Sequence, residues 1–137
     1  MCKLLMIDDN PLEHLIVEKM LTNNKLFPNA SHSLEGRLII EYLKTHFSDV
    51  EQLPDVIFLD LHMPEFSGWD FINNFEKIYP ELKKPIDIYI ASSSVNELDM
   101  QRSKEYPFVK DYLCKPLKKQ TLVDLYSFYQ SASGIAS

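Results

Sequence analysis

The sequence has little of what marks several classes of protein. Among its 137 residues are only two cysteines, Cys2 and Cys114, without ligand-like spacing, so we expect free thiols in a reducing, cytoplasmic setting. Basic residues number 14 against 20 acidic ones, and the net charge of -6 argues against a nucleic-acid-binding protein. No apolar run approaches the roughly 18 residues of a membrane helix, and the N-terminal MCKLLMIDDN is too short and too quickly acidic for a signal peptide. We therefore expect no contact with nucleic acid or membrane.

Internal repeats, low-complexity runs and long linkers are also missing, so we expect one compact domain at 1–130 and a frayed tail at 131–137. Short apolar runs alternate with segments of helical periodicity along this domain. Strands are expected at 3–7, 26–33, 55–60, 86–91 and 108–114, and helices at 11–23, 34–47, 69–79, 96–106 and 118–130. Such alternation predicts an α/β fold, a parallel sheet with helices on both faces and right-handed crossovers.

Some segments carry more detailed expectations. Pro11 suits the first turn of its helix, and Pro28 favours a sheet edge for the weak strand at 26–33. Residues at helical spacing in the first helix are Leu12, Leu15, Ile16, Lys19 and Met20. We interpret Cys114 as a strand core residue and Cys2 as an inert thiol. Three histidines without partners at ligand spacing are interpreted as surface or packing residues: His14, His32 and His46.

Polar side chains stand where the apolar strands end. Because ligands in open parallel sheets bind beyond the carboxyl ends of the strands, these side chains should meet at one edge. They are Asp8 and Asp9 after the first strand, Asp60 after the third, Ser92 with Ser93 and Ser94 after the fourth, and Lys115 followed by Pro116 after the fifth. The sequence therefore predicts three carboxylates, a hydroxyl and an ammonium group in one cluster.

Such a cluster needs more positive charge than one lysine supplies. Two carboxylates a few ångströms apart repel by roughly 1 kcal/mol in bulk water and about 4 kcal/mol at an effective dielectric constant of 20. A hard divalent cation suits them, and Mg²⁺ takes one or two carboxylates together with waters and phosphate oxygens. Positioning and charge neutralisation are what phosphoryl transfer needs, and carboxylates serve as phosphoryl acceptors. We therefore interpret Asp60 as the group that is phosphorylated.

Four motifs, MIDDNP, FLDLHMPEFSGW, YIASSS and YLCKPL, together resemble the receiver domain of bacterial two-component response regulators. The resemblance covers residues 3–130 and is greatest to stand-alone, single-domain regulators. It implies a flavodoxin-like, doubly wound (βα)5 fold with a five-stranded parallel sheet in the order 2-1-3-4-5.

The resemblance also implies roles for the residues at the strand ends. Asp60 is the phosphoacceptor, and Asp9 and Asp60 bind Mg²⁺ directly, helped by the backbone carbonyl of His62. Asp8 helps to hold the metal through water. Lys115 pairs with a phosphoryl oxygen.

Further residues are implied in switching. Ser92 hydrogen-bonds the phosphoryl group and moves toward it, and Tyr112 swings inward when the hydroxyl moves. Pro116 follows a cis peptide bond that turns Lys115 toward the site. The family's usual Thr-Ala is here Ser92-Ser93, so the hydroxyl role is open between these two serines.

Another departure concerns the strand at 108–114. The spacing from Ser92 to Lys115 is about one residue longer than in the family, and Pro107 stands where the family often has Gly-Ala. We expect an unusual face formed by this strand and the helix before it.

The resemblance implies a protein that takes a phosphoryl group from a sensor histidine kinase or phosphotransfer protein and is not an enzyme beyond its own phosphorylation and slow self-dephosphorylation. Output would be a protein contact on the face of the helix at 96–106, the strand at 108–114 and the helix at 118–130, since no effector domain fits after residue 130. A phosphatase with an aspartyl nucleophile is disfavoured, because His62 stands where its second acid would be. A receiver-like interaction module independent of phosphate is the remaining alternative.

Simpler interpretations of single residues stay open. Asp9 could cap the first helix, since Asp is a favoured N-cap, and one of the three serines could cap the fourth. Tyr112 could be a packed strand aromatic rather than a switch. The His62 ring is expected to be exposed, because Mg²⁺ prefers oxygen ligands.

Overall fold

Each predicted strand–helix pair is present in the structure, a computed structural model that describes residues 2–94 and 96–136. The strands are β1 (Leu4–Ile7), β2 (Ser31–Ser33), β3 (Val56–Leu59), β4 (Asp87–Ser92) and β5 (Val109–Cys114). The helices are α1 (Pro11–Asn23), α2 (Gly36–Thr45), α3 (Gly68–Ile78), α4 (Glu97–Ser103) and α5 (Lys119–Ala136), with a short 3₁₀ turn η1 (Tyr79–Glu81) after α3. All strand pairs are parallel and the order is β2-β1-β3-β4-β5, which confirms the predicted fold class.

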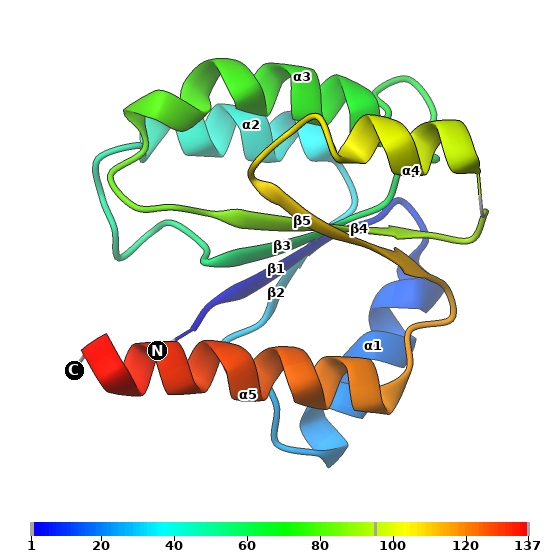
Figure 1. The fold of residues 1–137 in the computed structure, drawn as a ribbon, viewed down its shortest axis with the longest axis vertical. Coiled ribbons are helices and arrows are strands. Elements are labelled where there is room, and N and C mark those ends of the chain that lie inside the picture. The colour runs from blue at the N-terminus through cyan, green and yellow to red at the C-terminus, as the bar shows by residue number, and fades with distance from the viewer. Residues whose placement is uncertain (1, 95, 137) are drawn as a thin grey trace.

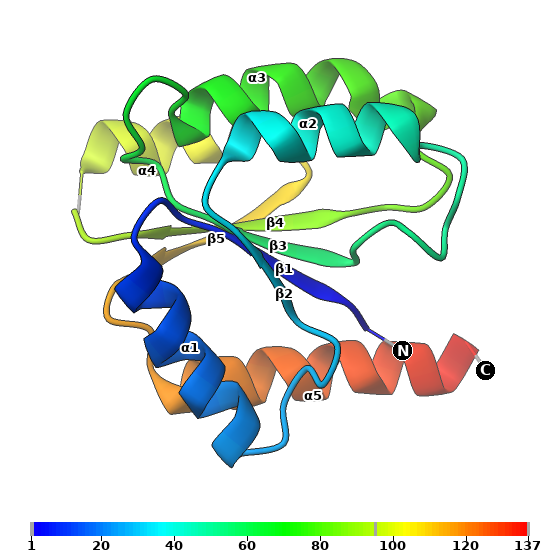
Figure 2. The ribbon, with the colours of Figure 1, turned by 180° about the vertical axis from the view of Figure 1, so that it is seen from behind.

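Two layers of helices enclose the sheet. Helices α2, α3 and α4 lie over one face, and α1 and α5 lie over the other (Figure 1; Figure 2 shows the same layers from behind). Successive residues of β1 enter different cores: Leu5 and Ile7 pack under the first layer, whereas Leu4 and Met6 pack against the second. Because both faces are covered, the central strands are continuous apolar runs, the pattern typical of buried parallel sheets.

Helix α1 has the predicted bounds, but the residues noted at helical spacing are not the ones that are buried. Its buried residues are His14, Val17 and Leu21, one stripe at i, i+3 and i+7, and Met20 packs beside them partly buried. Apolar residues on the neighbouring face are exposed: Leu12, Leu15 and Ile16. The sequence left His14 open as a surface residue or a packing residue. The side chain is buried, so His14 is a packing residue.

Strand β2 begins at Ser31, five residues later than expected. The chain before it turns instead of extending, because Lys25 and Phe27 adopt positive φ angles of 55° and 41°. Phe27 is buried in this turn and fills the core beneath α1 and α5. The apolar pair Leu26-Phe27 thus looks like strand in the sequence, although it is a buried turn.

The extra residue predicted between Ser92 and Lys115 is taken up in β5. The register passes from Ile88↔Val109 to Tyr89↔Asp111, so Lys110 is not paired in the β4–β5 register and forms a bulge. Beyond the bulge the pairing is regular as far as Ser92↔Cys114. The C-terminal end of β5 therefore keeps its alignment with the end of β4.

Other differences lie at the edges of the fold. Helix α5 continues to Ala136, beyond the end expected at residue 130 and into the segment expected to fray. Cys114 is exposed and not in the core as predicted, because β5 is an edge strand, whereas Cys2 is buried. No helix among the described residues is both long enough and apolar enough to cross a membrane.

The aromatic centre of the first core gives a stability prediction. The Phe75 ring is completely buried between those of Phe71 and Phe108, with ring centroids 5.9 and 4.9 Å away. We expect Phe75→Ala to lower the free energy of unfolding by about 3–5 kcal/mol, because it removes burial and leaves a cavity. Urea unfolding measures this. The matched control is Phe128→Ala at a site 63% exposed, which should change the value by less than about 0.5 kcal/mol; equal losses in both variants would contradict the assigned core.

Candidate functional site

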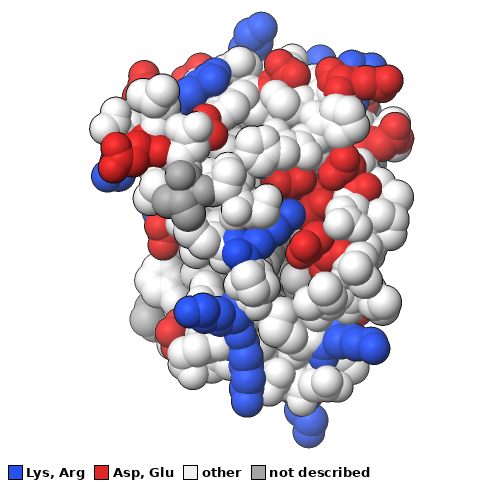
Figure 3. Space-filling view, turned by 90° about the vertical axis from the view of Figure 1, so that its right-hand side faces the viewer, with Lys and Arg blue, Asp and Glu red and all other residues white. Residues whose placement is uncertain are grey.

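The polar residues predicted to converge do so at the carboxyl edge of the sheet. Asp8 follows β1, Asp60 follows β3, Ser92 ends β4 and Lys115 follows β5. Parallel pairing carries all four to the same edge, and the Lys115 amide donates to the Ser92 carbonyl at 2.8 Å. Figure 3 views this edge of the molecule, where acidic side chains gather in a hollow near the middle with a basic side chain beside them.

Three carboxylates form the centre of the site. One oxygen each of Asp8, Asp9 and Asp60 lies within 4.8 Å of the others. The Asp8 and Asp60 side chains are buried, with exposed fractions of 1% and 6%, whereas Asp9 reaches solvent. Helix α1 is capped by the side chain of Asn10 and not by Asp9, so the simpler role for Asp9 is wrong. An all-oxygen donor set with one side open to water fits a hard divalent cation such as Mg²⁺.

Lys115 is the ammonium group that faces these acids. Its Nζ donates to Asp8 Oδ2 at 2.6 Å and lies 3.6 Å from Asp60 Oδ1. Burial alone would lower the pKa of Lys115, but the hydrogen bond to Asp8 and the charge of Asp60 outweigh it, so the pKa is raised. The lysine is therefore held in its charged form. The peptide bond that follows it, Lys115–Pro116, is cis.

The loop after Asp60 is held by close backbone packing. The His62 amide donates to Asp60 Oδ1 at 3.3 Å, and the Gly68 amide donates to the Leu61 carbonyl at 3.0 Å. A Cβ atom at residue 68 would lie 2.5 Å from the Asp60 carbonyl oxygen, so only glycine fits there. A capping box between Ser67 and Asp70 starts α3 at this point. Asp60 is thus fixed by the strand before it and by the helix that begins beside it.

The three serines differ in their surroundings. Ser92 is completely buried, and its Oγ accepts from the Ser94 amide at 3.2 Å, whereas Ser93 is exposed. The Tyr112 hydroxyl donates to the Ser94 carbonyl at 3.1 Å, so this half-buried ring is tied to the loop that follows Ser92. Helix α4 is capped by Asn96, so none of the three serines serves as its cap.

Sequence reasoning missed two histidine contacts near the site. The His62 ring is exposed as expected, but its Nε2 lies 2.9 Å from Ser94 Oγ and so joins the β3–α3 loop to the serine loop. The buried His14 Nε2 lies 2.7 Å from the Asp8 carbonyl oxygen. Both contacts join residues whose proximity depends on the completed sheet. The spacing of the histidines in the sequence gives no signal of them.

Comparisons with known proteins agree with this geometry. The family model of the response regulator receiver domain matches residues 4–127. The chemotaxis protein CheY of Thermotoga maritima is 25% identical over 122 residues, covering 89% of this chain and 92% of that protein. The peroxide stress-activated histidine kinase mak3 of Schizosaccharomyces pombe is 28% identical over 130 residues, 90% of this chain but only 5% of the kinase. A two-component response regulator structure from Cytophaga hutchinsonii has a TM-score of 0.82 at 22% identity, covering 94% of this chain and 96% of the other.

The crowded acids give a prediction about pH. Burial, followed by the charge of Asp8, raises the pKa of Asp60 above its ordinary value of 3.8, and Lys115 only partly opposes this rise. The folded state therefore binds this proton more tightly than the unfolded state does, and ionisation of Asp60 costs stability as the pH rises above 3.8. We expect Asp60→Asn to be more stable than the natural chain at pH 7 without divalent metal, and the gain to disappear below pH 3.8.

Urea unfolding at both pH values, in buffer with a chelator, measures this difference. The control is Asp124→Asn, which changes an exposed carboxylate on α5 and should show no such gain. If Asp60→Asn were less stable than the natural chain at pH 7, the cluster would stabilise the ionised form of Asp60 and the prediction would be wrong.

Proposed function

Because the chain belongs to the response regulator receiver domain family, we propose that Asp60 accepts a phosphoryl group and that the resulting change is passed to a protein partner. The observation that carries this proposal is the convergence of two further acids and one lysine on a buried Asp60. Lys115 Nζ lies 3.6 Å from its carboxylate, and oxygens of Asp8 and Asp9 lie within 4.8 Å of it. Proteins of this family are in general signalling proteins and not classical enzymes.

The metal site follows from the same residues. Asp9 and Asp60 would bind Mg²⁺ directly, with the backbone carbonyl of His62, and Asp8 would hold it through water. When bound, the ion neutralises charge on the oxygens of the transferred group. This charge compensation is needed because Lys115 supplies one positive charge for three carboxylates.

The chain's own residues account for the transfer. One oxygen of Asp60 attacks phosphorus in line, forming an O–P bond as the P–N bond of a donor phosphohistidine breaks. The Lys115 ammonium group, already positioned by Asp8, neutralises a second phosphoryl oxygen. The fixed loop at Gly68 keeps the carboxylate in place, so little rearrangement is needed before attack.

Ser92 and Tyr112 are proposed to change position when the phosphoryl group is present. Ser92 would move to donate a hydrogen bond to it, leaving space that Tyr112 can enter. Support comes from the Tyr112 hydroxyl, which holds the carbonyl of Ser94 two residues beyond Ser92, so a shift of this loop must change the Tyr112 contact. Ser92 is favoured over Ser93 because its hydroxyl is buried at the end of β4, whereas Ser93 is exposed.

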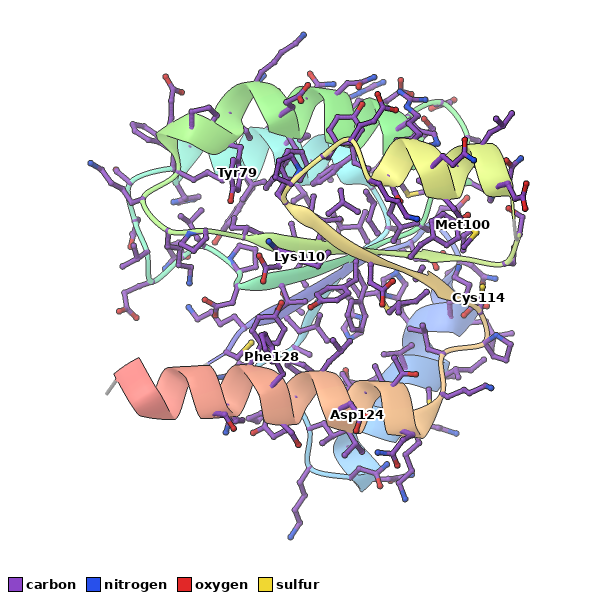
Figure 4. All side chains as sticks on the ribbon, viewed as in Figure 1. Tyr79, Met100, Lys110, Cys114, Asp124 and Phe128 are labelled. Atoms are coloured by element: carbon purple, nitrogen blue, oxygen red, sulfur yellow. The ribbon has the colours of Figure 1, made fainter. Side chains whose placement is uncertain are left out.

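Output is proposed to occur on the face of α4, β5 and α5. Figure 4 views this face, with Met100 on α4, Lys110 on β5 and Phe128 on α5 labelled. Large apolar side chains are exposed there, Leu98 by 76% and Phe128 by 63%, and they offer contact area to a protein. The phosphodonor would be a sensor histidine kinase or phosphotransfer protein, consistent with a histidine kinase and a chemotaxis protein among the relatives.

Phosphorylation is tested with acetyl phosphate and Mg²⁺. One phosphoryl group per chain should appear by intact mass, and Asp60→Asn should abolish it, because an amide is not a nucleophile for phosphorus. Asp124→Asn is the matched control and should be labelled like the natural chain. Label mapped to a serine or to Asp8 would contradict the assignment, and no labelling under any condition would favour an interaction module that works without phosphate.

The switch is tested with Ser92→Ala and beryllofluoride, a mimic of the phosphoryl group. The lost hydrogen bond to an anionic oxygen is worth roughly 1.5–3 kcal/mol, comparable with the 1–3 kcal/mol typical of allosteric coupling. We expect the variant to bind the mimic, with amide chemical shift changes at Tyr112 and across 96–114 much smaller than in the natural chain. Ser93→Ala is the control and should respond fully. Full responses in both variants and in the double variant would refute a hydroxyl-coupled switch.

A further inference from the structure

Three hydrogen bonds connect the acid site to the outer surface of α1. His14 Nε2 lies 2.7 Å from the Asp8 carbonyl oxygen. The Nδ1 atoms of His14 and His32 are 2.7 Å apart, and His32 Nε2 lies 2.7 Å from a carboxylate oxygen of Glu18. His14 and Glu18 are one turn apart on α1, and His32 is the middle residue of β2. The chain of contacts thus joins α1, β2 and the loop after β1.

The ends of this chain fix the roles of the ring nitrogens. A backbone carbonyl can only accept, so His14 Nε2 donates to Asp8, and a carboxylate accepts, so His32 Nε2 donates to Glu18. A hydrogen bond between the two Nδ1 atoms then needs a third proton, so one of the two rings carries an N–H on both nitrogens and a positive charge beside the Glu18 carboxylate. Both nitrogens of the buried His14 ring are therefore engaged, and the His32 ring packs edge-on against it with centroids 4.9 Å apart. Neither ring can turn without breaking a hydrogen bond.

The carbonyl that His14 holds belongs to the peptide between Asp8 and Asp9. The other polar groups of Asp8 are also engaged: its amide donates to the Ser33 carbonyl, Oδ1 accepts from the Asn10 amide and Oδ2 accepts from Lys115. The plane of the Asp8–Asp9 peptide sets the directions in which both side chains leave the backbone. The His14 contact therefore constrains the relative positions of the two carboxylates.

We propose that His14, steadied by His32 and Glu18, is a positioning residue for the metal-binding pair Asp8 and Asp9. It does not contact the ion; it holds the peptide from which both acids project. This inference rests on the proposed function, since the ion concerned is Mg²⁺. Partners that orient ligands from outside the coordination sphere typically change metal affinity by 10–100-fold when removed, and loss of the His14 donor should raise the Kd for Mg²⁺ about tenfold.

The experiment compares Mg²⁺ affinity of the full chain and its variants, by calorimetry or by amide chemical shifts. His14→Leu removes the donor at similar size, whereas His14→Gln keeps an amide N–H at a similar distance along the side chain. Val17→Ala is the matched control, because it loosens the buried face of the same helix without touching a polar contact. We expect about a tenfold higher Kd for His14→Leu, and values within about threefold of the natural chain for His14→Gln and Val17→Ala.

The outcomes separate this inference from the proposed function. If the natural chain does not bind Mg²⁺, the metal-dependent function is wrong. If it binds and a folded His14→Leu binds equally well, or if Val17→Ala loses as much affinity, the positioning role is refuted. Should His14→Leu fail to fold, His32→Leu decides, because it leaves the Asp8 contact without its support. A rise of at least about threefold in the Kd of His32→Leu for Mg²⁺ supports the inference, and an unchanged Kd overturns it.

Discussion

The ion pair between Lys115 and Asp8 joins residues 107 positions apart and closes the functional edge of the sheet. It exists only when β1 and β5 lie on either side of β3 and β4, in the order observed. The two side chains are only 10% and 2% exposed, so each charge would be costly to desolvate alone, and the ion pair offsets part of that cost. Because one ammonium group meets three carboxylates, the compensation is incomplete. The negative charge that remains suits a divalent cation bound among the three acids.

The two halves of the site rest on different parts of the fold. The acids follow β1 and β3, which are central strands, and Gly68 and His14 hold the backbone on either side of them. Ser92 and Tyr112 belong to β4 and the edge strand β5, and they are joined through a loop contact. Backbone at the sheet edge can shift at lower cost than backbone at its centre, because fewer buried contacts must change. The arrangement suits a chemical site that stays fixed beside a region that responds.

The strand order of the fold and most residues of the site could be predicted from the sequence. Strands buried on both faces are apolar runs, and each strand end is visible as a change to polar residues. Asp60 and Lys115 stand out for this reason. The rotation of α1 could not be predicted, since Leu12, Leu15 and Ile16 form a stripe as regular as the one that is buried. The observed rotation brings His14 to the Asp8 carbonyl and to His32, and these contacts arise only after the sheet has formed. The late start of β2 depends likewise on positive φ angles at two non-glycine residues, which ordinary residue preferences do not suggest.

The bulge at Lys110 bears on how such a chain can change over evolutionary time. One residue added to a strand normally turns every later side chain to the opposite face. Here the insertion is absorbed before Tyr112, so the strand end next to β4 keeps its phase and Lys115 keeps its place. The part of β5 before the bulge can therefore differ in length while the end of the strand and Lys115 keep their positions. On the function proposed above, contacts along the outer part of β5 would be free to vary in evolution without disturbing the pairing of Lys115 with Asp8 and Asp60.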